Sequence, residues 1–257
     1  MSDEDDAVLR ERRGRLLVIT INRPDQRNAV NAAVAQGIAA ALDELDGDSA
    51  LAVGVLTGAG KGFCAGMDLK AFVAGERPHV PGRGFAGIVE RSADKPLVAA
   101  VEGFAVAGGL EVALACDVIV ASRGTRFGIP EVKRSLVAAG GGLLRLPRAL
   151  PRNVALELAL TGEPIDAERA HALGLVNRLT EPGDALTAAL ALADSIAANG
   201  PLALAATKRV IREAPDWPEA EFFERQRPIT DPVFTSEDAR EGATAFAERR
   251  DPVWKGR

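Results

Sequence analysis

The sequence predicts an α/β fold in which strands alternate with helices around a largely parallel sheet. Over residues 15–22, Leu17, Ile19 and Ile21 occupy alternate positions, which is the period of a strand. Over residues 30–45 the apolar positions recur every three or four residues, which predicts an amphipathic helix. Short apolar runs typical of strands buried on both faces follow at residues 51–57, 97–101 and 118–121. This alternation favours parallel pairing, because parallel strands need a crossover connection between them.

The second half of the chain changes in character towards helices. We expect a brief strand at residues 175–179 and helices at residues 154–160, 166–173, 184–198 and 202–212. Beyond Pro215 the chain is richer in charge and carries scattered aromatic side chains, so we interpret it as a helical appendage packed on the core or on another subunit. We therefore divide the chain into a core with the active site, residues 1–198, and a C-terminal helical region, residues 199–257. Residues 73–85, rich in proline and glycine, are the best candidate for a mobile surface loop near a site.

Composition and charge exclude several classes of function. The 257 residues carry a formal net charge of −5 with mixed signs, which argues against a nucleic-acid partner bound through phosphate neutralisation. No apolar stretch reaches the ~18 residues that a membrane span requires. The N-terminus lacks the basic start and apolar run of a signal peptide, so we expect a cytoplasmic protein with no membrane partner. Cys64 and Cys116 lie in apolar surroundings without metal-ligand spacing, which favours reduced, packed thiols over a disulfide or a metal site.

Residues 62–70 combine a glycine-rich turn with a helix expected to start near Asp68. Small residues let a ligand approach the main chain, and the first amides of a helix lack intrahelical partners. Such free donors can hold an oxyanion. By residue type, a plain strand-to-helix turn is an equally good interpretation, and the Gly-Lys-Ser/Thr ending of a phosphate-binding loop is missing.

Two glutamates stand at expected helix starts further along the chain. In residues 101–117 a glycine pair opens a strongly apolar helix with Glu111 in its first turn, where a buried carboxylate is costly unless it is paired or used. Glu131 follows Pro130, which restricts the backbone, and residues 140–142 are three glycines. Stabilisation of a helix dipole by Glu111 and a common Pro-Glu helix start at Glu131 stay open as alternatives.

Together these segments fit one reaction class. Two carboxylates in separate environments can act as acid and base on neighbouring carbons, while two backbone amides hold an enolate oxygen. An α,β-unsaturated thioester needs both features. His79 in a Pro/Gly loop and His171 within a helix are expected to be structural or exposed, and no Gly-x-Ser-x-Gly segment supports a Ser-His-Asp hydrolase.

In their order along the chain, these motifs resemble the crotonase (enoyl-CoA hydratase/isomerase) superfamily from about Arg15 to the C-terminus. The similar segments are residues 22–24, 27–29, 64–70, 103–117, 127–131, 140–142, 161–162, 174–177 and 246–254. The resemblance implies a crotonase-like spiral of repeated ββα units, followed by a C-terminal helical trimerisation region. Homotrimers of this kind often pair into hexamers.

The resemblance also implies roles for particular residues. The amides of Met67 and Gly108 would form an oxyanion hole, Glu111 would deprotonate the attacking water, and Glu131 would exchange a proton at the α-carbon. The residues implied along the CoA moiety are Gln26, Arg27, Ala29, Ala65, Asp68, Leu69 and Lys70, with Phe246 and Arg249 reaching it from a neighbouring subunit. No cofactor or metal is implied, because coenzyme A is part of the acyl-CoA thioester substrate.

The presence of both glutamates favours an enoyl-CoA hydratase of fatty acid metabolism, because related isomerases and dehalogenases typically lack one of them. Two alternatives change the reaction: a dehydratase for a specialised acyl group such as a carnitinyl thioester, or an enoyl-CoA double-bond isomerase. An alternative of another class is a non-catalytic CoA- or RNA-binding scaffold. The net negative charge disfavours an RNA-binding scaffold, and the presence of both Glu111 and Glu131 disfavours a non-catalytic role.

Overall fold

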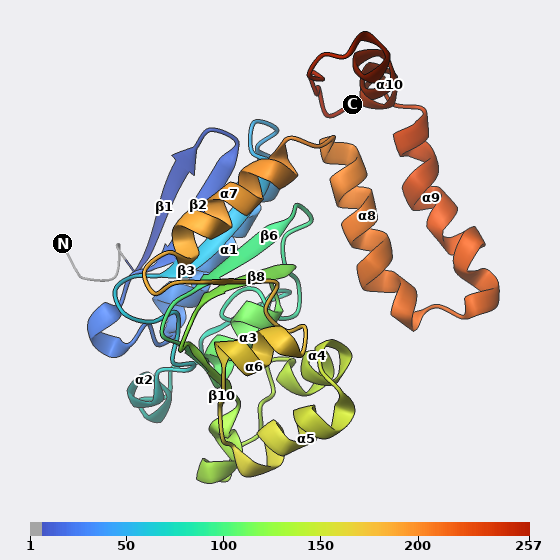
Figure 1. Ribbon diagram of the computed structural model, residues 1–257. Coiled ribbons are helices and arrows are strands. Elements are labelled where there is room, and N and C mark those ends of the chain that lie inside the picture. Colours follow the sequence, from blue (N-terminus) through green and yellow to red (C-terminus); the bar gives the residue numbers. More distant parts are fainter. Residues whose placement is uncertain (1–6) are drawn as a thin grey trace.

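The computed structural model describes residues 7–257, which are built around a six-stranded sheet (Figure 1). The strand order is β1-β2-β3-β6-β8-β11, in which β1 is antiparallel to β2 and the other neighbours are parallel. The bounds are Val8–Arg13 (β1), Leu16–Ile21 (β2), Val53–Gly58 (β3), Leu97–Val101 (β6), Val118–Ser122 (β8) and Arg178–Thr180 (β11). The predicted α/β class with a largely parallel sheet is confirmed.

A long helix covers each face of this sheet. Helix α1 (Ala32–Gly47) shares a core with Leu17 and Ile19 of β2, whereas α7 (Ala185–Ala197) packs on the opposite face with Leu16. Successive residues of a strand point to opposite faces, so β2 supplies both cores. The inner strands therefore read as continuous apolar runs in the sequence.

A second, smaller sheet takes part in the repeated ββα units of the fold. It contains β7 (Phe104–Val106), β9 (Arg126–Gly128) and β10 (Ile165–Asp166), in the order β10-β9-β7. The chain passes from the large sheet to the small sheet and into a helix twice, as β6–β7–α3 (Gly108–Leu114) and as β8–β9–η2 (Pro130–Arg134). Cys64 forms an isolated parallel bridge to Ala105, so β3 and α2 (Leu69–Val73) make a further unit of the same kind. The spiral of ββα units implied by the resemblance is confirmed.

Short elements complete the core. The expected surface loop at residues 73–85 contains an antiparallel hairpin of β4 (His79–Val80) and β5 (Gly84–Phe85), because Gly82 and Gly84 adopt the positive φ angles that a tight turn needs, 74° and 76°. The other short elements are η1 (Pro24–Gln26), α4 (Gly142–Ala149), α5 (Arg152–Thr161) and α6 (Ala167–Ala172).

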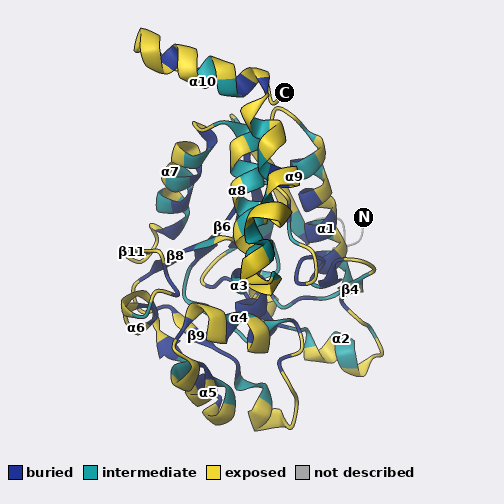
Figure 2. Cartoon of the chain, turned by 90° about the vertical axis from the view of Figure 1, so that its right-hand side faces the viewer, coloured by how far each residue is buried: buried dark blue, intermediate teal, exposed yellow. Residues whose placement is uncertain are grey.

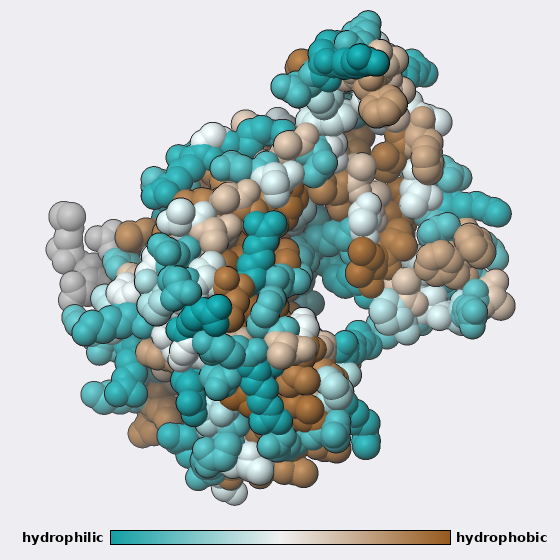
Figure 3. Space-filling model, viewed as in Figure 1, coloured by the Kyte–Doolittle hydropathy of each residue, from teal (hydrophilic) through white to brown (hydrophobic). Residues whose placement is uncertain are grey.

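The C-terminal helices form an arm that stands away from the core (Figure 1). It contains α8 (Pro201–Glu213), η3 (Ala214–Asp216), η4 (Glu219–Glu221), α9 (Phe222–Phe234) and α10 (Glu237–Glu248). Most of the arm is exposed or half-buried (Figure 2), and apolar side chains reach its surface (Figure 3). Phe234 and Phe246 are 78% and 87% exposed. The division between residues 198 and 199 falls in the short connection from α7 to α8 and stays a prediction.

Within residues 7–257, no single helix is long and apolar enough to cross a membrane. Helix α7 and the stretch formed by α8 and η3 pass that test as a pair, and the chain bends by 108° between them.

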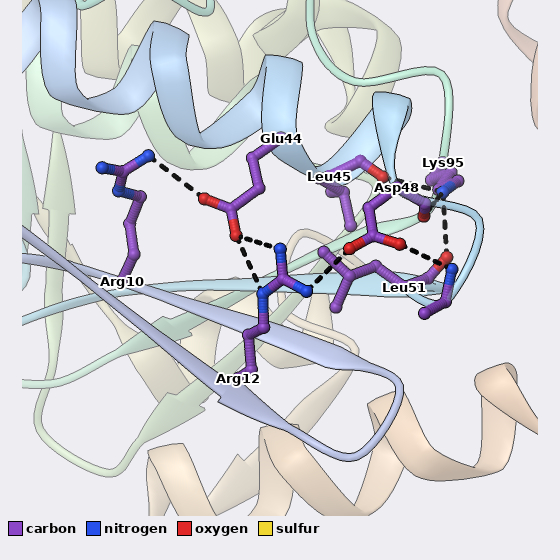
Figure 4. A network of polar contacts seen from close by, with 8 residues as sticks. Arg10, Arg12, Glu44, Leu45, Asp48, Leu51 and Lys95 are labelled. Atoms are coloured by element: carbon purple, nitrogen blue, oxygen red, sulfur yellow. Dashed lines mark hydrogen bonds and ion pairs between the residues drawn. The ribbon is translucent and has the colours of Figure 1, made fainter.

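Lys95 closes the C-terminal end of α1 (Figure 4). Its ammonium group donates hydrogen bonds to three backbone carbonyls, those of Leu45 (2.7 Å), Asp48 (2.7 Å) and Leu51 (2.9 Å). The last carbonyls of a helix lack intrahelical partners, so a cation at this place satisfies them and complements the helix dipole. Beside it, Arg12 of β1 forms an ion pair with Glu44 at 2.8 Å, which ties the edge strand to the same helix.

Replacement of Lys95 by Met should lower the free energy of unfolding by about 2–3 kcal/mol, because three part-buried carbonyls lose a charged donor. Urea denaturation followed by circular dichroism measures this change. Lys61 is exposed and its side chain has no hydrogen-bond partner within residues 7–257, so Lys61→Met serves as the matched control. The control should stay within about 0.5 kcal/mol of the wild type. Equal losses in the two variants would contradict the capping role of Lys95.

Candidate active site

The register of the small sheet places three turns at the same edge of that sheet. Cys64 is bridged to Ala105 of β7, and β7 pairs in parallel with β9. Met67 and Gly108 stand three residues after Cys64 and Ala105, and Glu131 stands three residues after the end of β9. Parallel neighbours run in the same direction, so the turns that follow them emerge at the same edge. Residues that are far apart in the sequence therefore line one cavity of about 550 Å³.

The amides of Met67 and Gly108 are free to bind a ligand in this cavity. Within residues 7–257 neither amide donates a hydrogen bond. The two turns are in contact: a Cβ atom added to Gly66 would lie 2.9 Å from the amide nitrogen of Gly108. Ala107 precedes that amide with a φ of 53°, a value that is rare for residues other than glycine and is typical of strained functional turns.

Glu111 is buried, with 4% of its surface exposed, and a glycine loop holds its carboxylate. The amide of Gly142 donates to Oε1 at 2.9 Å, and the amide of Gly140 also donates to the carboxylate. Burial raises the pKa of Glu111, while the two amides and the nearby Arg145 guanidinium lower it without returning it to its ordinary value. A Cβ atom on Gly140 would lie 2.5 Å from Oε2, so the loop closes around the carboxylate without room for a side chain.

Glu131 lies in the first turn of η2 and is half-buried. Its Oε2 atom is fully buried and has no hydrogen-bond partner among residues 7–257. Burial raises the pKa of Glu131, its own amide lowers it, and the negative charge of Glu111 raises it again. Neither glutamate forms an ion pair with a described residue. Raised pKa values and a place in the same cavity as the two free amides suit both carboxyl groups to proton exchange with a ligand bound there.

Helix α2, the β4–β5 hairpin with the segment that follows it, and the loop before α4 supply the remaining wall of the cavity. Two ionisable side chains, His79 and Glu90, belong to this wall. His79 was expected from the sequence to be structural or exposed, and it is exposed, whereas Glu90 was not singled out. The place of His79 in a loop that was expected to border a site was the signal that could have assigned it to the cavity. His171, by contrast, pairs through Nδ1 with the carbonyl of Val176 at 2.8 Å, which confirms its structural role. The apolar residues of the wall include Phe72, Phe85, Val89, Leu136 and Val137.

The residues expected along CoA differ in where they lie relative to the cavity of this chain. Asp68 uses its carboxylate structurally, because it caps α2 and pairs with Arg23 at 3.0 Å. Phe246 and Arg249 lie at the end of α10 and do not line the cavity of their own chain. Those that line the cavity are Arg27, Ala65 and Leu69, whereas Gln26, Ala29, Asp68 and Lys70 are their neighbours in sequence outside its lining.

The model of the enoyl-CoA hydratase/isomerase family matches residues 11–257. The chain belongs to this family. It is 45% identical to the enoyl-CoA hydratase EchA19 of Mycobacterium tuberculosis over 259 residues, or 97% of each chain. It is 42% identical to a carnitinyl-CoA dehydratase of Salmonella paratyphi A over 255 residues, which cover 96% of this chain and 97% of the relative.

Among solved structures of the hydratase/isomerase family, the crystal structure of enoyl-CoA hydratase EchA1 from Mycobacterium marinum is similar with a TM-score of 0.96. The two chains are 62% identical, and the match covers 98% of this chain and 99% of that one. The superfamily suggested by the motifs is therefore confirmed over nearly the whole chain, including the C-terminal arm.

Replacement of Glu111 by Gln should lower the pKa of Glu131 in this hydratase/isomerase family member, because the charge that raises it is removed. Titration of ¹³C-labelled glutamate carboxyls by NMR measures the change. Glu90 lines the same cavity but does not contribute to the pKa of Glu131, so Glu90→Gln is the matched control and should leave that pKa unchanged. An unchanged or higher pKa of Glu131 in Glu111→Gln would show that the two carboxyls are not coupled.

Proposed function

We propose that this family member is an enoyl-CoA hydratase, which adds water reversibly across the 2,3 double bond of a 2-enoyl-CoA thioester. One observation carries the proposal: two free backbone amides and two carboxyl groups with raised pKa values line one cavity. Hydration needs a base for the water, an acid for the α-carbon and donors for the enolate oxygen. The similarity to relatives named enoyl-CoA hydratase supports the same activity.

The proposed reaction begins when ionised Glu111 accepts a proton from water and the water oxygen bonds to C3 of the acyl group. The electrons of the double bond move towards the thioester, whose carbonyl oxygen gains negative charge between the amides of Met67 and Gly108. Each such donor contributes about 3–4 kcal/mol to the transition state. Protonated Glu131 then donates its proton to C2 and the thioester carbonyl re-forms. The unpartnered Oε2 atom of Glu131 supports a protonated starting state, because a buried neutral carboxyl costs less than a buried charge.

Coenzyme A enters as part of the substrate, so this reaction uses no other cofactor. In this proposal the CoA moiety lies along residues 26–29 and 65–70, mainly against backbone groups. The amide of Ala65 donates to the carbonyl of Arg27 at 3.1 Å, which supports one continuous wall formed by the two segments. The thiols of Cys64 and Cys116 are free, which supports a reducing, cytoplasmic location.

The active form in this proposal is a homotrimer or a pair of trimers, in which Phe246 and Arg249 complete the CoA site of a neighbouring copy. Phe246 is 87% exposed at the end of an arm that stands away from its own core. Large exposed apolar side chains favour a protein interface. Light scattering of the purified protein tests this assembly, and a monomeric mass would contradict it.

A second candidate, a dehydratase for an acyl group with a cationic end such as a carnitinyl thioester, is favoured by one feature of the wall. Glu90 lines the same cavity as Phe72 and Phe85, and its carboxylate has no partner among residues 7–257. Anionic and aromatic groups together suit a quaternary ammonium ion. The similarity to a relative named carnitinyl-CoA dehydratase supports this second candidate.

Glu111→Gln and Glu131→Gln should each lower kcat for hydration of crotonyl-CoA by about 10²–10⁴-fold, because each removes a proton-transfer group while keeping its shape. Loss of the conjugated-thioester absorbance measures the rate. Reaction in H₂¹⁸O should place the label in the product hydroxyl group, whereas double-bond isomerisation would incorporate none. Turnover close to wild type in either variant would refute the role of that residue.

Glu90→Gln should lower kcat/KM for a 2-butenoyl-CoA that carries a trimethylammonium group on C4 by about tenfold, because it removes the charge that attracts the cation. The rate for crotonyl-CoA should stay within about twofold. Parallel assays of the two thioesters measure this split. A wild-type enzyme that hydrates crotonyl-CoA and leaves the cationic thioester unchanged would remove the second candidate and keep the first.

A further inference from the structure

Arg145 of α4 lies behind the candidate active site and outside the lining of its cavity. It borders a second groove of about 970 Å³ between the core and α8, and Glu90 lines both this groove and the active-site cavity. Its side chain is only half-exposed, and burial lowers the pKa of its guanidinium group. A partly buried arginine needs acceptors for its five N–H groups, so its partners identify what it holds in place.

The guanidinium group joins two segments of the cavity wall. Nη2 donates to the carbonyl of Val89 at 2.5 Å, and Nη1 donates to the carbonyl of Gly140 at 3.4 Å. These carbonyls lie 51 residues apart in the sequence, in the segment after the hairpin and in the glycine loop. A planar fork can reach both at a fixed separation, whereas a lysine ammonium has no rigid geometry.

The glycine loop is shaped around this fork. Gly141 has a φ of +94°, and a Cβ atom at this position would lie 2.2 Å from Nη1 of Arg145. Gly140 and Gly142, on either side of it, are the residues whose amides hold the Glu111 carboxylate. The loop therefore connects the guanidinium group to that carboxylate, without an ion pair between the two side chains among residues 7–257.

The electrostatic surroundings of Glu111 support the same connection. The positive charge of Arg145 lowers the pKa of Glu111, and Glu131 on η2 is the carboxyl coupled to it. The other ionisable groups of the cavity lining are Arg27, His79, Glu90 and Arg134.

We propose that Arg145 is a positioning residue for the hydration step, which holds the Gly140–Gly142 loop against the Val89 segment and so aims the Glu111 carboxylate at the attacking water. This inference rests on the hydratase function proposed above. It assigns Arg145 an effect on turnover that is separate from CoA binding, because the CoA segments and the oxyanion amides belong to other turns.

The test compares Arg145→Gln and Arg145→Lys with Arg148→Gln. Arg148 lies on the same helix, is exposed and pairs with Asp216 at 3.0 Å, so its replacement should leave kcat within about twofold. Arg145→Gln should lower kcat for crotonyl-CoA by about 10–100-fold with KM within about twofold, because a displaced base loses its alignment. It should also move the acidic limb of the kcat/KM profile to higher pH, since Glu111 must be ionised and loses a charge that lowers its pKa. Arg145→Lys keeps the charge and loses the fork, so it should lower kcat without moving the limb.

A double-mutant cycle separates positioning from general stability. In the Glu111→Gln background, Arg145→Gln should cause no further fall in the residual rate, because its effect passes through Glu111. The proposal is overturned if folded Arg145→Gln keeps the wild-type kcat and the wild-type acidic limb of the pH profile, or if it lowers the rate equally in both backgrounds.

If Arg145→Gln does not fold, Arg145→Lys decides the question. A reduced kcat at constant KM supports the proposal, and a wild-type kcat overturns it. A wild-type protein without hydratase activity would overturn the proposed function and this inference together, whereas an active wild type with unaffected Arg145 variants would overturn this inference alone.

Discussion

Parallel pairing in the small sheet is the constraint on which the site depends. Hydrogen bonds from Val106 to Cys64 (3.1 Å) and from Ala107 to Gly128 (2.8 Å) hold three successive segments at one level. The segments approach closely because glycine stands where they meet: a Cβ atom on Gly109 would lie 2.1 Å from the carbonyl oxygen of Cys64. A register shift of one residue would separate the turns that carry the two free amides. The spiral thus converts a repeated local connection into a convergent site.

The same arrangement lowers stability at several points. Ala107 keeps a φ of 53°, a conformation that costs of order 1–3 kcal/mol for a residue with a side chain. Glu111 is buried with two amides for compensation, and Glu131 has a buried oxygen atom without any partner among the described residues. These costs gather around one cavity while both faces of the large sheet are well packed. Such a distribution is typical of a site in which function and stability compete.

The long elements could be predicted from the sequence, because α1, β2 and β6 carry a strong period or an uninterrupted apolar run. The short strands β7, β9 and β10 were not predicted, since two or three residues are too few for a period. Strand β1 was missed because it is a charged edge strand with an exposed face. Helix α4 escaped prediction because Pro147 lies inside it and glycines precede it.

By itself the sequence determined which functional groups are present, namely two acidic side chains at helix starts and glycine-rich turns that can offer free amides. The order of its motifs also identified the superfamily. The tertiary structure alone decided which of these groups meet. Glu111 is held by Gly142, 31 residues further along, while the hairpin and the segment after it bring His79 and Glu90 into the wall of the same cavity. Local patterns record backbone preference and burial, whereas convergence depends on strand register and on contacts between distant segments, which no single stretch of sequence encodes.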